Sequence, residues 1–531
     1  MQGPAIRIAK ELGLFTVVAD GSSTAPCRPM ADQFEQIDLK DKEGIEDLAL
    51  SLRKSGGLAG IMTAGTDFSA TVAWVAERLE LPGIPYESAL NASDKARMRA
   101  CFKKAGLPSP EFTAITKSES LEKPVLPFPL VVKPVDNMGG RGCRKVNNMD
   151  EYREAVTEAI RFSRSGRAIA EAFMDGPEFS VDAIVYQSEI MICGLADRHI
   201  FYPPYFIEMG HTMPTAIPPE QQNALLETFR AGVRALGLAG EKSAGSAKGD
   251  IKLTSKGPMI GEIAARLSGG YMSGWTYPYS SGAEPVRAAI LGAIGRKPEG
   301  IAPLKNWTSA ERAFISIPGT VKEISGIETA QSRPFIKDVF FRIAEGTKVD
   351  FPRNNVSKCG NIISAGPERA EAVEAVESAV RSILVRLDPA DPETGEFLST
   401  TGSGEFGVGF PPDAFQLSVK LRATLNTLPD TVIQGQKENL RIYPFPAFLA
   451  SGLKDYAGRD VVESLEAVRA LTGLKLPEFH AESAIKPPES SDNNRNNLLG
   501  RQFWSALARG GYQGAVYYID RIREWGVGSG E

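Results

Sequence analysis

The sequence has few cysteines and few histidines, and they are not grouped. Its 531 residues contain five cysteines, with no CxxC pair, and three histidines. Such a distribution fits neither a disulfide framework nor a structural zinc site, and it favours a reducing compartment. No Ser/His/Asp or Cys/His arrangement is evident, so we expect no side-chain nucleophile in whatever reaction the protein performs.

The sequence also lacks a strong charge of either sign and any long apolar run. The formal net charge is −5, which gives no broad electrostatic reason to bind nucleic acid or an anionic membrane. No run approaches the roughly 18 apolar residues that span a bilayer, and the N-terminus has no signal-like stretch. We therefore expect a cytoplasmic protein of several domains that binds small molecules, without nucleic-acid or membrane partners.

The first ninety residues alternate between strand-like and helical segments. Strands are predicted over 15–20 and 58–65, and helices over 44–55 and 69–79. This alternation is typical of a doubly wound α/β domain. The chain opens on the helical stretch "MQGPAIRIAKELGL", although a parallel strand normally precedes such a helix. The domain is thus expected to lack its first strand, either because the given start lies inside that turn or because the edge is short.

A glycine-rich hairpin, "LVVKPVDNMGGRGCRKV", occupies residues 130–146. Glycines expose backbone N–H groups and let phosphate oxygens approach closely, while Lys133 and Arg141 add positive charge. We interpret the stretch as a loop that closes over a polyphosphate. The plain alternative is an ordinary turn, because a glycine cluster alone is a weak signal.

A second hairpin is predicted over 249–271. If residues 255–257 form its loop, Asp250 lies opposite Glu262 and Lys252 opposite Ile260. Two opposed carboxylates destabilise a sheet unless a cation lies between them, and such oxygen ligands suit Mg²⁺ beside phosphates. Arg266 is expected near the same phosphates. The alternative is a solvent-facing hairpin with another loop length.

Four motifs in order resemble the ATP-grasp superfamily: "SDK" (93–95), "VVKPVDNMGGRGC" (131–143), "EAFMDGPEFSVD" (171–182) and "DIKL…GEIAARLSGG" (250–270). The resemblance is to carboxylate–amine ligases of the L-amino acid ligase kind, related to the ATP-grasp modules of biotin carboxylase and carbamoyl-phosphate synthase, and runs to about residue 385. It implies a mixed α/β and α+β fold. The implied domains are a pre-ATP-grasp domain (1–92), an ATP-grasp domain (93–300) with a nucleotide-binding subdomain (about 126–190), a lid (301–385) and a mostly helical extension of unknown role (386–531).

The resemblance implies an ATP site that uses Mg²⁺, or Mn²⁺ in its place. Lys95 and Lys133 fall at positions that contact the nucleotide phosphates. The remaining ATP-binding positions, which form the loop over the phosphates, the adenine pocket and the ribose contact, are Asn137, Met138, Gly139, Gly140, Gly142, Glu171, Ala172, Phe173, Met174 and Glu178. For Phe173 and Met174 the alternative is ordinary core packing.

The same resemblance assigns the metal ligands and the catalytic side chains. Asp250 and Glu262 fall at metal-ligand positions, and Arg266, Lys133 and Arg141 at catalytic ones. The sequence departs from the family at Ala264, where many members have an Asn ligand. A usual third metal ligand is therefore absent.

The segment "FIEMGHTMPTAIP" (206–218) resembles the substrate-facing segment of ATP-grasp amino-acid ligases. The resemblance puts Glu208 and His211 near a substrate amino group and carboxylate, and Ser268, Gly269 and Gly270 as donors to a carboxylate. A lone histidine is more often structural, and the glycines have the alternative of a plain corner between strand and helix.

The implied reaction phosphorylates a small-molecule carboxylate, and an amine then displaces the phosphate from the acyl phosphate. Both substrates are small molecules, and a homodimer is compatible with the resemblance. Two alternatives stay open. One is phosphorylation of bicarbonate by a biotin-carboxylase-like or carbamoyl-phosphate-type enzyme, and the other is an ATP-binding regulator without catalysis, for which Ala264 is the main support.

Overall fold

The computed structural model describes residues 2–116, 124–400, 409–434, 439–475 and 497–525. Its contacts divide the chain into two units. The first comprises 1–201, 208–311 and 363–373, and the second 202–207, 312–362 and 374–531. In the described part of the chain, no helix combines the length and the apolar character needed to cross a membrane. The expected mixture of α/β and α+β architecture is confirmed.

The chain enters the first unit through helix α1 (Gly3–Glu11), which is followed by two parallel strands, β1 (Val17–Asp20) and β2 (Gln33–Gln36). Helices α2 (Lys42–Ser55), α3 (Ser69–Arg78) and α4 (Tyr86–Ser93) complete this part. Helices α2 and α3 correspond to the helices predicted over 44–55 and 69–79.

The predicted strand over 58–65 is wrong, because this segment forms no strand. Its residues and those of β1 line a common, mainly apolar cavity of about 480 Å³. A strand exists only where a neighbouring backbone accepts its hydrogen bonds, and apolar sequence alone does not supply that neighbour.

A four-stranded antiparallel sheet with order β3-β6-β4-β5 carries the glycine-rich loop. The strands are β3 (Phe112–Ile115), β4 (Leu130–Pro134), β5 (Arg144–Val146) and β6 (Ala168–Ala172), and helix α6 (Met149–Phe162) packs on them. Leu130 and Val132 are fully buried in the core with α6, whereas Lys133 alternates to the other face. Period-two alternation thus delivers the lysine to the side away from this core.

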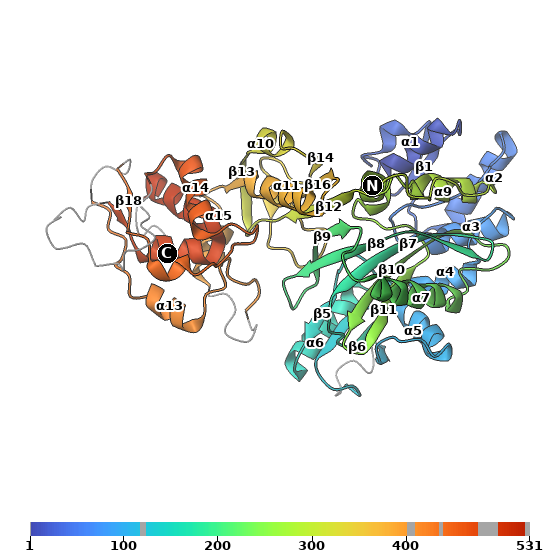
Figure 1. Ribbon diagram of the computed structural model, residues 1–531, viewed down its shortest axis with the longest axis horizontal. Coiled ribbons are helices and arrows are strands. Elements are labelled where there is room, and N and C mark those ends of the chain that lie inside the picture. Colours follow the sequence, from blue (N-terminus) through green and yellow to red (C-terminus); the bar gives the residue numbers. More distant parts are fainter. Residues whose placement is uncertain (1, 117–123, 401–408, 435–438, 476–496, 526–531) are drawn as a thin grey trace. The chain divides into compact units, whose positions relative to one another are not determined.

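The larger sheet of the first unit contains antiparallel neighbours in the order β11-β10-β7-β8-β9. Their bounds are β7 (Glu178–Tyr186), β8 (Glu189–Phe201), β9 (Ile207–Met213), β10 (Ala244–Thr254) and β11 (Gly257–Ala264). Helix α7 (Pro219–Ala235) runs along β10 and β11, and α5 (Lys95–Lys104) lies near α7 (Figure 1). Helices α8 (Tyr277–Ser280) and α9 (Pro285–Ala293) follow.

The hairpin of β10 and β11 has the predicted central pair and a different loop. Asp250 lies opposite Glu262, as expected, but Lys252 pairs with Met259, because the turn has two residues rather than three. A bulge between Asp250 and Ile251 shifts the register by one residue and restores the Asp250 pair.

The second unit combines small sheets with the C-terminal helices. Its strands include the three-stranded sheet β15-β13-β17 and the parallel pair β18-β19. Element bounds from β12 onward are β12 (Thr308–Phe314), β13 (Gly319–Ser325), α10 (Ile327–Gln331), β14 (Ile336–Phe341), β15 (Lys348–Val349), β16 (Gly360–Gly366), α11 (Arg369–Ser382), β17 (Leu384–Leu387), α12 (Pro392–Ser399), α13 (Val419–Leu425), β18 (Arg441–Ile442), α14 (Val461–Thr472), β19 (Leu498–Leu499) and α15 (Arg501–Trp525).

Helix α15 ties the C-terminal residues to β17. Its Asp520 accepts two hydrogen bonds of 2.8 Å from Arg386, and its Tyr512 hydroxyl accepts one of 2.7 Å from the Val385 N–H. The predicted helical content of this extension agrees with α14 and α15. Two stretches of this extension fall largely outside the described residues: the glycine-rich stretch 401–413, which the sequence predicts to be a linker, and the polar low-complexity stretch 487–500.

Replacing Gly232 by Val should weaken the packing of α7 on β11. A Cβ atom at Gly232 would lie 2.5 Å from Ile263 Cδ1 and 2.8 Å from Ile260 Cδ1, so the two isoleucine side chains or the helix must shift. We expect a loss of about 1–3 kcal/mol in the free energy of unfolding, measured with urea. Ala224→Val, at an exposed position of the same helix, controls for the β-branched side chain, and equal stability of the two variants would contradict the packing.

Candidate active site

Lys95 joins three parts of the first unit. The Asp94 carboxylate caps α5 by accepting from the Ala96 and Arg97 N–H groups, so Lys95 stands at the first helical position. Its side chain is buried, and Nζ donates to the Asn137 carbonyl at 2.9 Å and lies 3.3 Å from Glu262 Oε1. One ammonium group therefore connects the helix start, the glycine-rich loop and the β10–β11 hairpin.

The glycine-rich loop has a backbone that other residues adopt with difficulty. Gly139, Gly140 and Gly142 have φ values of 69°, 75° and 66°, in the left-handed region. Arg141 Nε donates to the Met138 carbonyl at 3.1 Å. The predicted catalytic Arg141 thus contacts its own loop in this structure, and its catalytic role stays a prediction.

Glu171 lies between two cations. Its Oε1 is 2.8 Å from Arg99 Nε and its Oε2 is 2.8 Å from Lys133 Nζ. Burial alone would raise the pKa of Glu171, but Arg99 and Lys133 lower it. Sequence reasoning missed Arg99, although a charged residue one helical turn after Lys95, on the buried face of α5, was a usable signal.

The predicted adenine positions are only partly available. The Ala172 and Phe173 N–H groups donate to the carbonyls of Glu111 and Pro129, at 2.9 and 3.1 Å, so these two donors cannot also serve a base. The Phe173 ring is half-buried and lies 4.2 Å from Lys145 Nζ. Phe173 is therefore not an ordinary core side chain.

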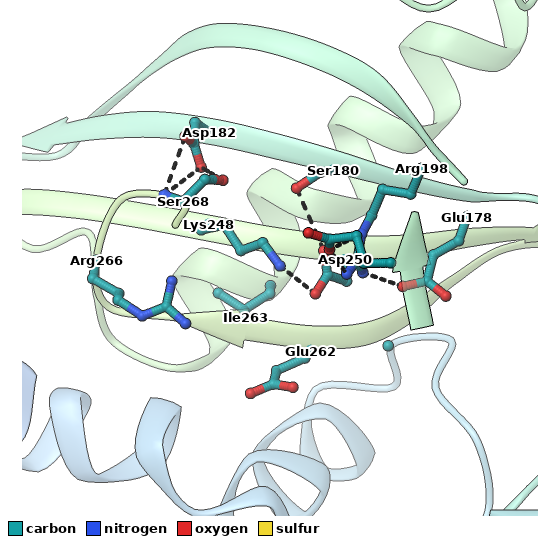
Figure 2. A network of polar contacts seen from close by, with 12 residues as sticks. Glu178, Ser180, Asp182, Arg198, Lys248, Asp250, Glu262, Ile263, Arg266 and Ser268 are labelled. Carbon is teal, nitrogen blue, oxygen red and sulfur yellow. Dashed lines mark hydrogen bonds and ion pairs between the residues drawn. The ribbon is translucent and has the colours of Figure 1, made fainter. Parts of the chain in front are cut away.

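Arg198 on β8 contacts carboxylates from three other strands: Glu178 on β7, Glu208 on β9 and Asp250 on β10. Figure 2 shows Arg198 with Glu178 and Asp250. Its Nη1 is 2.9 Å from Asp250 Oδ1, and its Nε is 3.1 Å from Glu208 Oε2. Burial alone would lower the pKa of Arg198, but Asp250, Glu178 and Glu208 raise it. No motif in the sequence marks Arg198 as a site residue.

Cationic side chains surround Glu262 on the hairpin. Burial alone would raise its pKa, but Lys95 first, and then Lys133, Lys248 and Arg266, lower the pKa of Glu262 to about 2. Glu262 is thus ionised, and its side chain is 34% exposed. Sequence reasoning missed Lys248, which contacts Asp250.

Arg266 has a buried guanidinium that is only partly hydrogen-bonded. The side chain is nearly fully buried, Nη1 donates to the Leu267 carbonyl at 3.0 Å, and Nε has no hydrogen-bond partner among the described residues. A buried guanidinium N–H without a partner is costly unless a ligand accepts from it.

A divalent cation would find few ligands at the hairpin. Asp250 and Glu262 are directly opposed. Within the described residues, no group of three or more His, Cys, Asp or Glu side chains could hold a metal ion. The donor set therefore fits one weakly coordinated ion beside phosphates better than a closed protein cage.

His211 on β9 is held between two carboxylates. Its Nδ1 is 2.9 Å from Glu311 Oε2, and its Nε2 is 3.5 Å from Glu208 Oε2. Burial alone would lower the pKa of His211, but Glu208 and Glu311 raise it to about 9. His211 is thus an imidazolium at neutral pH. The structure brings Glu208 and His211 together and adds Glu311, which lies 100 residues from His211 in sequence. The expected contact of Glu208 and His211 with a substrate stays a prediction.

Ser268 donates to a carboxylate of the protein in this structure, and its expected contact with a substrate carboxylate stays a prediction. Its N–H and hydroxyl both donate to Asp182, and the hydroxyl contact is 2.7 Å. Burial raises the pKa of Asp182 to about 6, even though Ser268 opposes the rise. Gly270, with φ of 62°, lies beside the carboxylate of Glu208, since a Cβ there would be 3.1 Å from Glu208 Oε1. Gly270 therefore lies next to Glu208, while Ser268 is held by Asp182.

Comparison with known proteins agrees with this geometry. Residues 92–270 match the family model of the ATP-grasp domain, and residues 313–388 match that of the L-amino acid ligase C-terminal domain 2. An uncharacterized protein of Sinorhizobium fredii is 26% identical over 64% of this chain and 70% of its own. A D-alanine–D-alanine ligase of Marinobacter nauticus is 34% identical over 28% of this chain and 49% of its own.

Among solved structures, the L-amino acid ligase from Bacillus licheniformis aligns with a TM-score of 0.63 and 24% identity, covering 73% of this chain and 96% of that one. The chain spans about half the length of the D-alanine–D-alanine ligases that it matches. The chain therefore contains an ATP-grasp domain over residues 92–270. The region 313–388 is similar to the C-terminal domain 2 of L-amino acid ligases.

The charge of His211 can be measured directly, because the sequence has only three histidines. The raised pKa keeps the proton on the ring at neutral pH, so the His211 NMR signal should titrate near pH 9 rather than near 6.5. His211→Asn assigns the signal by removing it, and His199→Asn should leave it in place. A midpoint at or below 6.5 would show a neutral imidazole and contradict the contacts with Glu208 and Glu311.

Proposed function

We propose that this protein is an ATP-dependent ligase that activates a small-molecule carboxylate as an acyl phosphate and joins it to an amine, releasing ADP and phosphate. The observation that carries the proposal is the cluster of cations around Glu262, which consists of Lys95, Lys133, Lys248 and Arg266. Such a cluster neutralises the charge of a triphosphate and of the phosphoryl group in transfer.

Each residue has a defined task on this proposal. Lys95 and Lys133 bind phosphate oxygens, and the backbone N–H groups of the loop 137–142 cover them. Glu178 accepts from the ribose hydroxyls, and the apolar surface of Phe173 and Met174 borders the adenine. Arg266 holds the γ-phosphate or the carboxylate oxygens while charge moves between them.

The metal is proposed to be Mg²⁺, with Mn²⁺ as a substitute, and Glu262 is the carboxylate best suited to hold it. When bound, the ion draws charge from the phosphate oxygens. The chain's own residues position the ATP and the carboxylate, and no side-chain nucleophile is required.

The substrate carboxylate and amine are proposed to meet beside Glu208, His211, Gly269 and Gly270. The match to the L-amino acid ligase C-terminal domain 2 supports amino acids as the substrate class. The cationic His211 suits a carboxylate, and Glu208 suits an ammonium group. We also propose a cytoplasmic location, with small molecules as the partners.

Phosphorylation of bicarbonate is the second candidate. A biotin carboxylase from Campylobacter jejuni has a similar fold, with a TM-score of 0.53 and 17% identity. That level of similarity supports the fold alone. An ATP-binding regulator is the third candidate. Ala264 is its main support, and only turnover distinguishes it from a ligase.

A hydroxylamine trap should detect the acyl phosphate. Enzyme, Mg-ATP, hydroxylamine and a panel of amino acids and other carboxylates should yield a hydroxamate for the true substrate, because hydroxylamine replaces the amine. Arg266→Lys keeps the charge and loses the planar fork, so hydroxamate yield should fall by about tenfold or more with ATP binding little changed.

Bicarbonate serves as a separate arm of this assay, with ADP release as its readout. ADP release with bicarbonate, and no hydroxamate from any carboxylate, would favour the second candidate. ATP binding without either product would favour the regulator.

Mg-ATP should protect the glycine-rich loop from trypsin. Arg141 lies in this loop, and phosphate oxygens that accept from the loop N–H groups would order it. We expect slower cleavage after Arg141 with Mg-ATP, measured by mass spectrometry of the fragments. Arg141→Gln identifies the fragment by removing the cleavage site, and an unchanged cleavage rate at saturating ATP would count against the phosphate site.

A further inference from the structure

The site face of the β10–β11 hairpin carries four side chains of different chemistry. Lys248 lies opposite Ala264, and Asp250 lies opposite Glu262. Directly opposed residues of an antiparallel pair point to the same face of the sheet. An ammonium group and a methyl group therefore occupy the positions next to the two carboxylates, and neither can ligate a metal ion.

Asp250 is already neutralised by the protein. Lys248 Nζ contacts its Oδ2, Arg198 Nη1 is 2.9 Å from its Oδ1, and the Ser180 hydroxyl is 3.4 Å from Oδ1 (Figure 2). The Asp250 side chain is mostly buried. A divalent ion ligated by Asp250 would face two positive charges at contact distance, and the low-dielectric surroundings would weaken their repulsion very little.

Glu262 differs from Asp250 in both exposure and partners. Its side chain is a third exposed, and its ion pair within the described part of the chain is the 3.3 Å contact of Oε1 with Lys95 Nζ. It has no ion pair with Lys248 or Arg198 among the described contacts. Glu262 can therefore accept one divalent ion from the solvent side, while Asp250 cannot do so without losing a cation.

Together these contacts separate the two carboxylates by role. We infer that this chain binds its nucleotide with one divalent cation, ligated by Glu262, and that the Lys248 ammonium provides the second positive charge beside the phosphates. This inference rests on the proposed ATP site. Lys248 would contact phosphate oxygens while Asp250 and Arg198 hold the base of the hairpin in place.

The number of bound ions distinguishes this arrangement from a two-ion site. Mn²⁺ replaces Mg²⁺ and is visible by electron paramagnetic resonance, and a non-hydrolysable ATP analogue with an imido bridge prevents turnover. With saturating analogue, the wild-type protein should bind one Mn²⁺ per chain. Binding of two Mn²⁺ per chain would overturn the inference and leave the proposed ATP site intact.

Substitution of Lys248 tests the role of its charge. Lys248→Met keeps the length of the side chain and removes the ammonium, so the Kd for the analogue at fixed Mn²⁺ should rise about tenfold or more. Lys248→Arg keeps the charge and should retain one Mn²⁺ and a Kd within a few-fold of wild type. Lys256→Met, at the exposed turn of the same hairpin, is the matched control and should bind as wild type does.

The fold of each variant is checked by its circular dichroism and thermal transition. If Lys248→Met is folded and binds the analogue as tightly as the wild type, Lys248 has no phosphate contact and the inference is wrong. If Lys248→Met does not fold, the Lys248→Arg variant provides the test. A folded Lys248→Arg protein whose Kd for the analogue is raised about tenfold would contradict a role that depends on the charge of Lys248. If the wild-type protein binds no analogue at all, the proposed ATP site fails and the inference fails with it.

Discussion

The contact of Arg198 with three carboxylates is the constraint on which the rest of the site depends. Glu178, Glu208 and Asp250 come from three different strands and share this one buried guanidinium. Removing one partner from such a buried cluster leaves charges uncompensated and costs about 3–5 kcal/mol. The expected ribose contact, substrate contact and hairpin carboxylate are therefore fixed relative to one another before any ligand binds, which is the preorganisation that catalysis by positioning requires.

The hairpin shows how protein cations permit a pair of opposed carboxylates. Asp250 and Glu262 should repel each other, and the sequence alone suggested that a metal ion must lie between them. Side chains of the protein supply much of the positive charge that the two carboxylates require, because Lys248 and Arg198 contact Asp250 and Lys95 contacts Glu262. The hairpin is consequently compatible with a folded, metal-free state, and an ion is needed for the phosphates rather than for the fold.

Sequence reasoning found what is local and missed what is distant. The pairing of Asp250 with Glu262 follows from a short turn. The prediction of this pair is correct although the predicted loop length is wrong, because a bulge compensates for the shift in register. The contact of His211 with Glu311 spans 100 residues, and no local pattern encodes it. The segment 58–65 has the apolar composition of a strand, but a strand also needs a neighbouring backbone, which composition does not reveal.

The charges of the site divide it into two regions. Around Glu262 the protein presents cationic groups, which suit the phosphates, whereas Glu208 and Glu311 flank the single cationic ring of His211. On the proposed function, an ammonium group is favoured beside these carboxylates and disfavoured among the lysines. The amine would therefore approach the acyl phosphate from the Glu208 side, with the phosphate held on the other. The fixed field thus orients the two substrates, and no residue has to act as a nucleophile.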